Sequence, residues 1–166
     1  MHGIPGMSGV IVGIDPGLSG ALVALHPDGT FAWCHDIPVI TAGTKREIDE
    51  IELARLVDAA GPIDVAVLEK VGVRPGEGTV GAFTFGRGYG LLRGILRAHF
   101  VRIIDVTPAT WKKGVGIKTG AGKDASRALA KERFQQHAGL FARVKDDGRA
   151  EGALIALWGW EKEGRR

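Results

Sequence analysis

Residues 9–17 read GVIVGIDPG, an apolar run that ends in an aspartate and is followed at once by a Pro-Gly pair. The run is typical of a buried β-strand, and the Asp-Pro-Gly sequence is typical of a sharp turn. A carboxylate at the end of such a strand lies at the rim of a sheet, where α/β proteins usually place their chemistry. Asp15 is therefore the first candidate functional residue, with a simple turn residue as the alternative interpretation.

The segments around this run predict an α/β domain. Strands are expected at residues 9–15, 21–26, 31–37, 64–69 and 101–106. Helices are expected at residues 49–60, 80–99, 108–111, 123–137 and 147–161. The first three strands are joined by short turns and should form an antiparallel meander, whereas strands joined through helices should be parallel. The order predicts one mixed sheet with helices on its faces.

Length and composition indicate a single soluble domain. The chain has 166 residues, of which 45% are apolar and 25% charged, and this is enough for one domain with a hydrophobic core. Residues 1–8 are expected to be a flexible tail, residues 9–161 the folded domain and residues 162–166 a second tail. No apolar run approaches the ~20 residues that span a membrane. The single cysteine, Cys34, fits a reducing cytosol.

Basic residues are concentrated in one part of the chain. Residues 111–133 contain seven basic and two acidic side chains and so carry a net charge of +5, whereas the whole chain carries +3. Such asymmetry favours a polyanionic partner, most often nucleic acid. An ordinary solvated helix face is the alternative.

The glycine-rich segment at residues 116–123 lies within this basic region, and its glycines allow the main chain to approach a phosphate. It is not a Walker A loop, because Ile117 and Asp124 stand where that motif has glycine and serine or threonine. No nucleotide cofactor is therefore expected.

Four carboxylates are placed where they can share one site. Glu69 ends the fourth strand as Asp15 ends the first, so neighbouring strands would bring the two to one sheet edge, roughly 5 Å apart. Asp147 and Glu151 are four residues apart and share the face of the last helix that is expected to pack on the sheet. Carboxylates in this number form a hard-oxygen site for Mg²⁺ or Mn²⁺. Two such ions can hold the attacking water and the leaving oxygen of a phosphodiester.

The helical acids also have structural explanations. Asp147 and Glu151 are of the type that the helix dipole favours near an N-terminus. Asp146 is an alternative to Asp147 as a ligand, and its other expected role is to cap the last helix. The placement of two acids at strand ends and two on an inward helix face favours a shared site.

Three short motifs, in this order, resemble the RuvC-type Holliday junction resolvases of the RNase H-like (retroviral integrase) superfamily. They are GIDPG at residues 13–17, LE at residues 68–69 and DGRAE at residues 147–151. The resemblance covers nearly the whole chain, and the spacing is most similar to the compact resolvases of phages. It implies an RNase H-like mixed five-stranded sheet of order 3-2-1-4-5, with strand 2 antiparallel, which places Asp15 beside Glu69.

The resemblance also implies an activity, partners and a location. Such a protein nicks two opposing strands of a four-way DNA junction as a homodimer, with Mg²⁺ or Mn²⁺, in the cytoplasm of a bacterium or a phage-infected cell. Lys123 resembles the active-site lysine of the family and would stabilise charge on the scissile phosphate. The side chains expected to contact DNA are those of Arg74, Lys112, Lys113, Lys118 and Arg127.

Two positions depart from the bacterial RuvC pattern. Gly148 stands where that pattern has an acid or a histidine, and the available acid, Asp147, comes one residue earlier. Gly72 stands where it has an aromatic wedge, so wedging of bases at the junction centre is not implied.

The helix expected at residues 80–99 contains five glycines and three aromatic residues, Phe83, Phe85 and Tyr89. This composition fits either a dimer interface or close packing on its own sheet, and Trp111 is expected to anchor the core. Three other functions are alternatives: an actin-like or sugar-kinase-type phosphotransferase, a non-catalytic module that binds DNA branches, and a nuclease for flaps or general branched DNA. The phosphotransferase would need two such domains.

Overall fold

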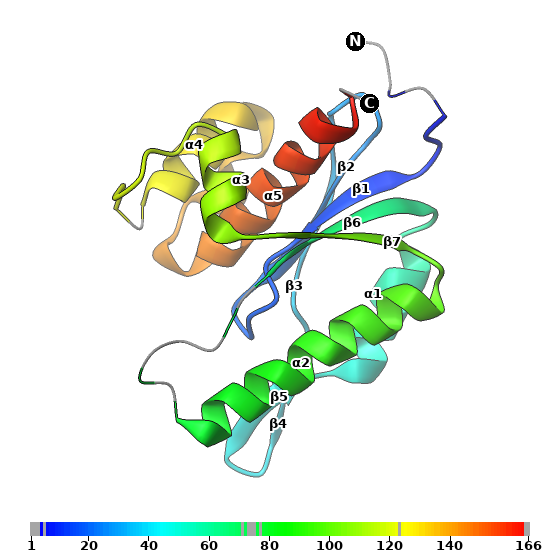
Figure 1. The fold of residues 1–166 in the computed structure, drawn as a ribbon, viewed down its shortest axis with the longest axis vertical. Coiled ribbons are helices and arrows are strands. Elements are labelled where there is room, and N and C mark those ends of the chain that lie inside the picture. Colours follow the sequence, from blue (N-terminus) through cyan, green and yellow to red (C-terminus); the bar gives the residue numbers. More distant parts are fainter. Residues whose placement is uncertain are drawn as a thin grey trace.

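A computed structural model describes residues 4, 6–70, 72, 76, 78–122 and 124–164. A five-stranded sheet of order β3-β2-β1-β6-β7 forms its centre, and β4 and β5 form a separate two-stranded sheet (Figure 1). The strands are β1 (Val10–Ile14), β2 (Ala21–Leu25), β3 (Phe31–Asp36), β4 (Val39–Ala42), β5 (Lys45–Ile48), β6 (Ile63–Glu69) and β7 (Arg102–Val106). The helices are α1 (Glu50–Ala59), α2 (Thr79–Ala98), α3 (Pro108–Gly114), α4 (Ala125–Arg133) and α5 (Asp147–Glu163), with 3₁₀ helices η1 (Gln135–Phe141) and η2 (Val144–Asp146).

The five-stranded mixed sheet expected from the sequence is confirmed. β2 runs antiparallel to β1 and β3, whereas β6 and β7 run parallel to β1. The order differs from the expected 3-2-1-4-5 only in numbering, because β4 and β5 precede the fourth strand of the main sheet. All residues of β1 and β2 are buried, as expected for central strands that are covered on both faces.

Two hydrophobic cores lie on the two faces of the sheet. One contains Ile11 and Val67 of the sheet together with buried residues of α3, α4 and α5. The other contains Val12 and Leu68 together with buried residues of α1 and α2. Successive residues of a strand point to opposite faces, so β1 and β6 contribute to both cores. Figure 1 shows α3, α4 and α5 on one side of the sheet and α1 and α2 on the other.

Several elements differ from the expectation. The β4-β5 hairpin was not predicted, because most of its residues are exposed and so lack an apolar pattern. The helix expected at residues 123–137 is shorter: α4 ends at Arg133, and the chain continues as η1. Helix α3 reaches Gly114, three residues beyond its expected end, and α5 reaches Glu163, two residues beyond its own.

Part of the segment expected to be a flexible N-terminal tail contacts the domain. Ile4 and Met7 pack against the core that contains Ile11 and the buried residues of α5. The Ile4 amide donates to the carbonyl of Pro27, and the Ser8 amide donates to Asp64. The helices in the described ranges are each too short or too polar to cross a lipid bilayer.

Helix α5 lies very close to the sheet, and two glycines allow this approach. A Cβ atom at Gly13 of β1 would lie 2.2 Å from the main chain of α5, at Gly152 and Ala156. A Cβ atom at Gly148 would lie 2.2 Å from the carbonyl oxygen of Ser19, in the loop that follows Asp15. Only glycine permits such close contact between main chains. The first turn of α5 is therefore held against the Asp15 loop.

Candidate active site

Asp15 and Glu69 lie at the same edge of the sheet. β1 and β6 are parallel neighbours, and Ile14 is paired with Leu68, so the next residue of each strand comes at the same level. Glu69 is buried, with 7% of its surface exposed, and Asp15 is half-buried. The adjacency expected from the strand order is thus observed.

The surroundings of Asp15 favour its protonated form. Burial, followed by repulsion from Glu69 and then from Glu151, raises the pKa of Asp15 to about 7. The Gly17 amide, 3.4 Å from Oδ1, and the positive charge of Lys112 act in the opposite direction but are weaker. The carboxyl groups of Asp15, which follows β1, of Glu69 in β6 and of Glu151 in α5 therefore interact electrostatically. Such a concentration of like charge is unfavourable unless a proton or a cation compensates it.

Glu151 reaches the same edge from α5 and contacts α3 and α4. Its Oε1 atom accepts a hydrogen bond from Ser126 Oγ at 3.3 Å and lies 2.9 Å from Lys112 Nζ. The Lys112 ammonium also lies 5.1 Å from the centre of the Trp111 ring. Lys112, which was expected to contact DNA, is therefore paired with one of the acids, Glu151, in this structure.

Asp147 is paired with an arginine. Its Oδ1 atom accepts a hydrogen bond from Arg127 Nη1 at 2.8 Å, and Arg127 also pairs with Asp124. Arg127 is only 8% exposed, so little of its surface is open to solvent. A guanidinium held between two carboxylates fits a structural role well. Here it joins α4 to the first turn of α5.

The four expected acids carry oxygen donors that suit a hard divalent cation, but their side chains do not all point to one place. In the described part of the chain, no group of three or more His, Cys, Asp or Glu side chains is arranged so that it could hold a metal ion. Asp15 interacts electrostatically with Glu69 and Glu151, whereas Asp147 is paired with Arg127. The four-acid metal site stays a prediction. Oxygen donors of this type fit Mg²⁺ or Mn²⁺. Asp147 would have to leave Arg127 to become a fourth ligand.

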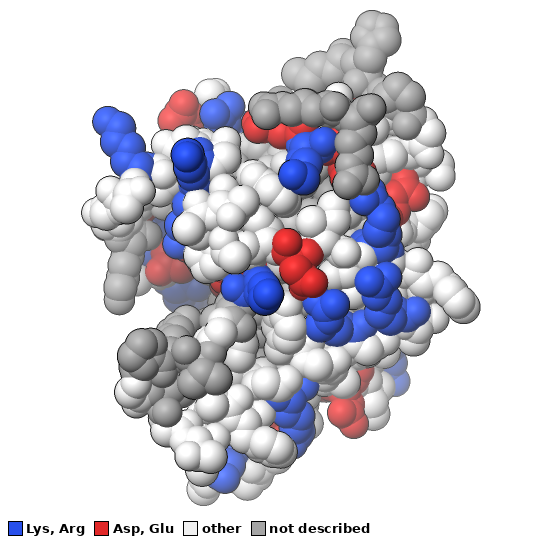
Figure 2. Space-filling view, viewed as in Figure 1, with Lys and Arg blue, Asp and Glu red and all other residues white. Residues whose placement is uncertain are grey.

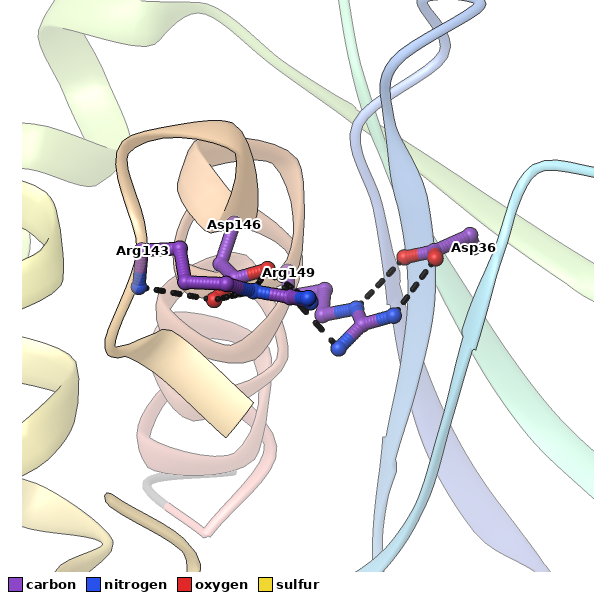
Figure 3. Close-up of polar contacts among 4 residues, drawn as sticks. All are labelled: Asp36, Arg143, Asp146 and Arg149. Carbon is purple, nitrogen blue, oxygen red and sulfur yellow. Dashed lines mark hydrogen bonds and ion pairs between the residues drawn. The ribbon is translucent and has the colours of Figure 1, made fainter. Parts of the chain in front are cut away.

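Asp146 is held in a network with Arg143 and Arg149 (Figure 3). It is 2% exposed and accepts hydrogen bonds at 2.8 Å from the Arg143 amide and from Arg143 Nη2. Arg149 lies 3.8 Å away and makes two hydrogen bonds of 2.6 Å to Asp36. Hydrogen bonds from the Arg143 side chain lower the pKa of Asp146. The Asp146 carboxylate therefore makes its contacts with Arg143 and Arg149.

The capping role expected for Asp146 needs a correction. The residue occupies the N-cap position of α5, but its side chain makes no capping hydrogen bond to that helix. It bonds back to the Arg143 amide instead, and so closes the preceding turn. Asp147 therefore remains the better candidate ligand of the two.

Trp111 connects Glu69 to α3. Its indole Nε1 donates a hydrogen bond to Glu69 Oε1 at 2.8 Å. The side chain of Trp111 is 0% exposed, which confirms its expected place in the core. The hydrogen bond itself had no signal in the sequence, because the two residues are 42 positions apart.

A hollow of about 650 Å³ opens beside Glu151 and Asp147. Its lining includes the exposed residues Lys113 and Lys118, two of the expected DNA contacts. Figure 2 shows several basic side chains over the region of α3 and α4, and a second group on the other side of this face, over β7 and α2. Arg74 and Lys123, the other expected contact and the expected catalytic lysine, lie outside the described residues.

One sequence comparison finds a junction resolvase. The chloroplastic Holliday junction resolvase MOC1 of Chlamydomonas reinhardtii is 33% identical over 86 residues, or 52% of this chain. The match spans only 10% of the length of MOC1. No family model matches the chain.

Solved structures share the fold over nearly the whole chain. RuvC of Thermus thermophilus superposes with a TM-score of 0.58 at 15% identity, covering 92% of this chain and 95% of RuvC. The same RuvC in complex with a Holliday junction substrate gives 0.62 at 14% identity, covering 93% and 95%. The yeast mitochondrial Holliday junction resolvase Ydc2 gives 0.51 at 14% identity, covering 95% and 80%. The chain therefore has the RuvC-like fold that its motifs indicated.

Proposed function

We propose that this protein is a metal-dependent DNA endonuclease that resolves four-way junctions by nicking two opposing strands. The observation that carries the proposal is that Asp15 and Glu69, adjacent at the sheet edge, interact with Glu151, which itself lines a basic hollow. Acids alone would suit many metal enzymes, but acids next to lysines on an accessible hollow suit a phosphodiester of DNA. The RuvC-like fold and the sequence match to a junction resolvase support the same substrate class.

The proposed cofactor is Mg²⁺ or Mn²⁺, with two ions in each active site. Asp15, Glu69 and Glu151 would hold the ions, and Asp147 would join them after it leaves Arg127. The ions would activate a water and stabilise the leaving oxygen of the phosphodiester. Hydrolysis in this way would leave 5′-phosphate and 3′-hydroxyl ends.

Lysines of the chain would hold the DNA strand beside the acids. Lys113 and Lys118 are exposed at the hollow, where each can pair with a backbone phosphate. Lys123 is proposed to stabilise charge on the scissile phosphate, and Arg74 to contact the junction. Lys112 would act near the acids, since it already lies against Glu151.

A homodimer is the proposed assembly, because paired nicks require two active sites related by symmetry. Helix α2 presents a suitable face: Val80 and Phe83 are 68% and 73% exposed. A hollow of about 280 Å³ lined by Leu18, Val80 and Phe85 lies next to them. Exposed apolar surface of this kind often marks an interface.

The test is a panel of DNA substrates of matched sequence: a four-way junction, a flap, a fork, a linear duplex and a single strand. The wild type with Mg²⁺ or Mn²⁺ should nick the junction at symmetric positions and leave the linear DNA intact, whereas Asp15→Asn should bind the junction without nicking it. Equal cleavage of flaps and forks would favour a general branched-DNA nuclease. Binding without nicking by the wild type would favour a non-catalytic branch-binding module.

A further inference from the structure

We infer that Trp111 is a positioning residue that orients the Glu69 carboxylate for metal binding and hydrolysis; the inference rests on the proposed nuclease function. The indole N–H donates to Glu69 Oε1 at 2.8 Å, and both side chains are buried. A hydrogen bond to a carboxylate is stronger than one between neutral groups, and low polarity around it strengthens it further. The bond also ties one oxygen of Glu69 to a rigid ring.

The ring is held firmly enough to act in this way. Trp111 is the fourth residue of α3, whose N-terminus is fixed by Pro108 and by the Thr107 side chain, which accepts from the Thr110 amide. Proline at this position matches the dihedral angles of a helix start. The indole packs in the core formed by the sheet and α5. It therefore has little freedom to follow a moving carboxylate.

Helix α3 contacts two of the acids through consecutive residues. Trp111 bonds to Glu69 of β6, and the next residue, Lys112, pairs with Glu151 of α5. One turn of α3 thus fixes the relative positions of carboxylates from two different elements. Outer hydrogen bonds of this kind orient metal ligands, and their loss typically lowers metal affinity or activity about 10- to 100-fold.

The chain offers a matched control in Trp160. Its indole N–H donates at 2.9 Å to the carbonyl of Pro27, on a part of the molecule away from the acids. Trp111→Phe and Trp160→Phe therefore each remove one indole N–H and keep an aromatic ring. If Trp111 only packs the core, both variants should lose stability while metal binding and turnover stay at the wild-type level.

The first experiment measures Mn²⁺ binding to each protein by calorimetry, together with kcat and the junction Kd. Trp111→Phe should weaken Mn²⁺ binding and lower kcat by about 10- to 100-fold with the junction Kd unchanged. Trp160→Phe should match the wild type in all three. Wild-type Mn²⁺ affinity and kcat in a folded Trp111→Phe would overturn the inference. If the wild type itself fails to nick junctions, the nuclease proposal fails instead.

A second measurement needs no folded Trp111 variant. The four tryptophans of the chain give four indole N–H signals in a ¹⁵N–¹H NMR spectrum, and Phe variants of Trp33, Trp158 and Trp160 assign the Trp111 signal by elimination. Addition of Mg²⁺ to the wild type should shift the Trp111 signal strongly and leave the Trp160 signal in place. A Trp111 signal that does not move while calorimetry shows bound Mg²⁺ would overturn the inference.

Discussion

Gly148, the second residue of α5, lies directly against the carbonyl oxygen of Ser19: a Cβ atom at residue 148 would be 2.2 Å from that oxygen. No side chain fits at this contact, so an acid cannot stand there without a shift of α5. Glycine is the residue that this contact accommodates. The contact also fixes the distance between α5 and the loop that follows Asp15.

Gly148→Ala should therefore both destabilise the protein and displace the acids of α5. We expect the free energy of unfolding to fall by about 1–3 kcal/mol, as for other overpacking changes, and junction nicking to fall as well. Gly139→Ala is the control, because a Cβ atom there would meet nothing within 4 Å. Chemical denaturation and nicking assays check both variants. A Gly148→Ala protein as stable and active as the Gly139→Ala protein would contradict this account of α5.

The raised pKa of Asp15 predicts how stability depends on pH in metal-free protein. Burial, Glu69 and Glu151 raise this pKa from 3.8 to about 7, so the folded protein keeps a proton that the unfolded chain has lost between these values. The unfolded chain binds fewer protons in this window, so the contribution of Asp15 to stability falls as pH rises from about 4 to 7.

Asp15→Asn should remove this penalty. The variant should match the wild type in stability near pH 4 and exceed it by on the order of 2–4 kcal/mol above pH 7. Denaturation curves recorded with a chelator across this range measure the difference. A difference that stays constant with pH would show that Asp15 titrates normally.

Substitution of Asp146 should mainly lower stability, whereas substitution of the neighbouring Asp147 should mainly lower nicking. Asp146→Asn weakens the buried network with Arg143 and Arg149, so the free energy of unfolding should fall by about 1–3 kcal/mol. Asp147→Asn should change stability less, because its carboxylate is partly exposed, but should abolish nicking if Asp147 binds metal. Parallel melting and nicking assays separate the two. If Asp146→Asn stays stable but loses nicking, while Asp147→Asn still nicks, the metal ligand is Asp146 rather than Asp147.

The salt dependence of junction binding should distinguish exposed cations from the buried one. Removal of Lys113 or Lys118 should reduce the slope of log K against log salt by about one each, because each side chain releases one counterion. Arg127→Gln should leave the slope unchanged and lower stability instead, because Arg127 is buried against Asp147. A slope reduced by Arg127→Gln as much as by the lysine variants would place Arg127 on the DNA.

The fold could be predicted from the sequence where burial leaves a clear pattern. The apolar runs before Asp15 and Glu69 mark strands that are covered on both faces. Which strands are neighbours was implied by the resemblance to the RuvC-type resolvases, and the sheet order confirms it. The β4-β5 hairpin escaped prediction because exposed strands carry no such pattern. Helix α4 ends early because Phe134 leaves the helical conformation and enters the core.

The site could be predicted only as far as strand order determines it. The adjacency of Asp15 and Glu69 follows from two parallel strands that end at one edge. The partners of the side chains do not follow, because they depend on contacts between elements distant in sequence. Trp111 was expected only to fill the core, and Arg127 only to face DNA. Their bonds to acids became visible once α3, α4 and α5 were placed together on the sheet.

The central claim is that Asp15 and Glu69 act together with a divalent ion to cut junction DNA. The most direct measurement is a denaturing-gel assay of a four-way junction with each strand labelled in turn, with Mg²⁺ or Mn²⁺, for the wild type and Glu69→Gln. The account predicts that the wild type cuts two opposing strands at symmetric positions and leaves ends that a ligase can rejoin. Glu69→Gln should bind the junction equally well and cut neither strand. A wild type that binds the junction but leaves every strand intact with both metals would contradict the account.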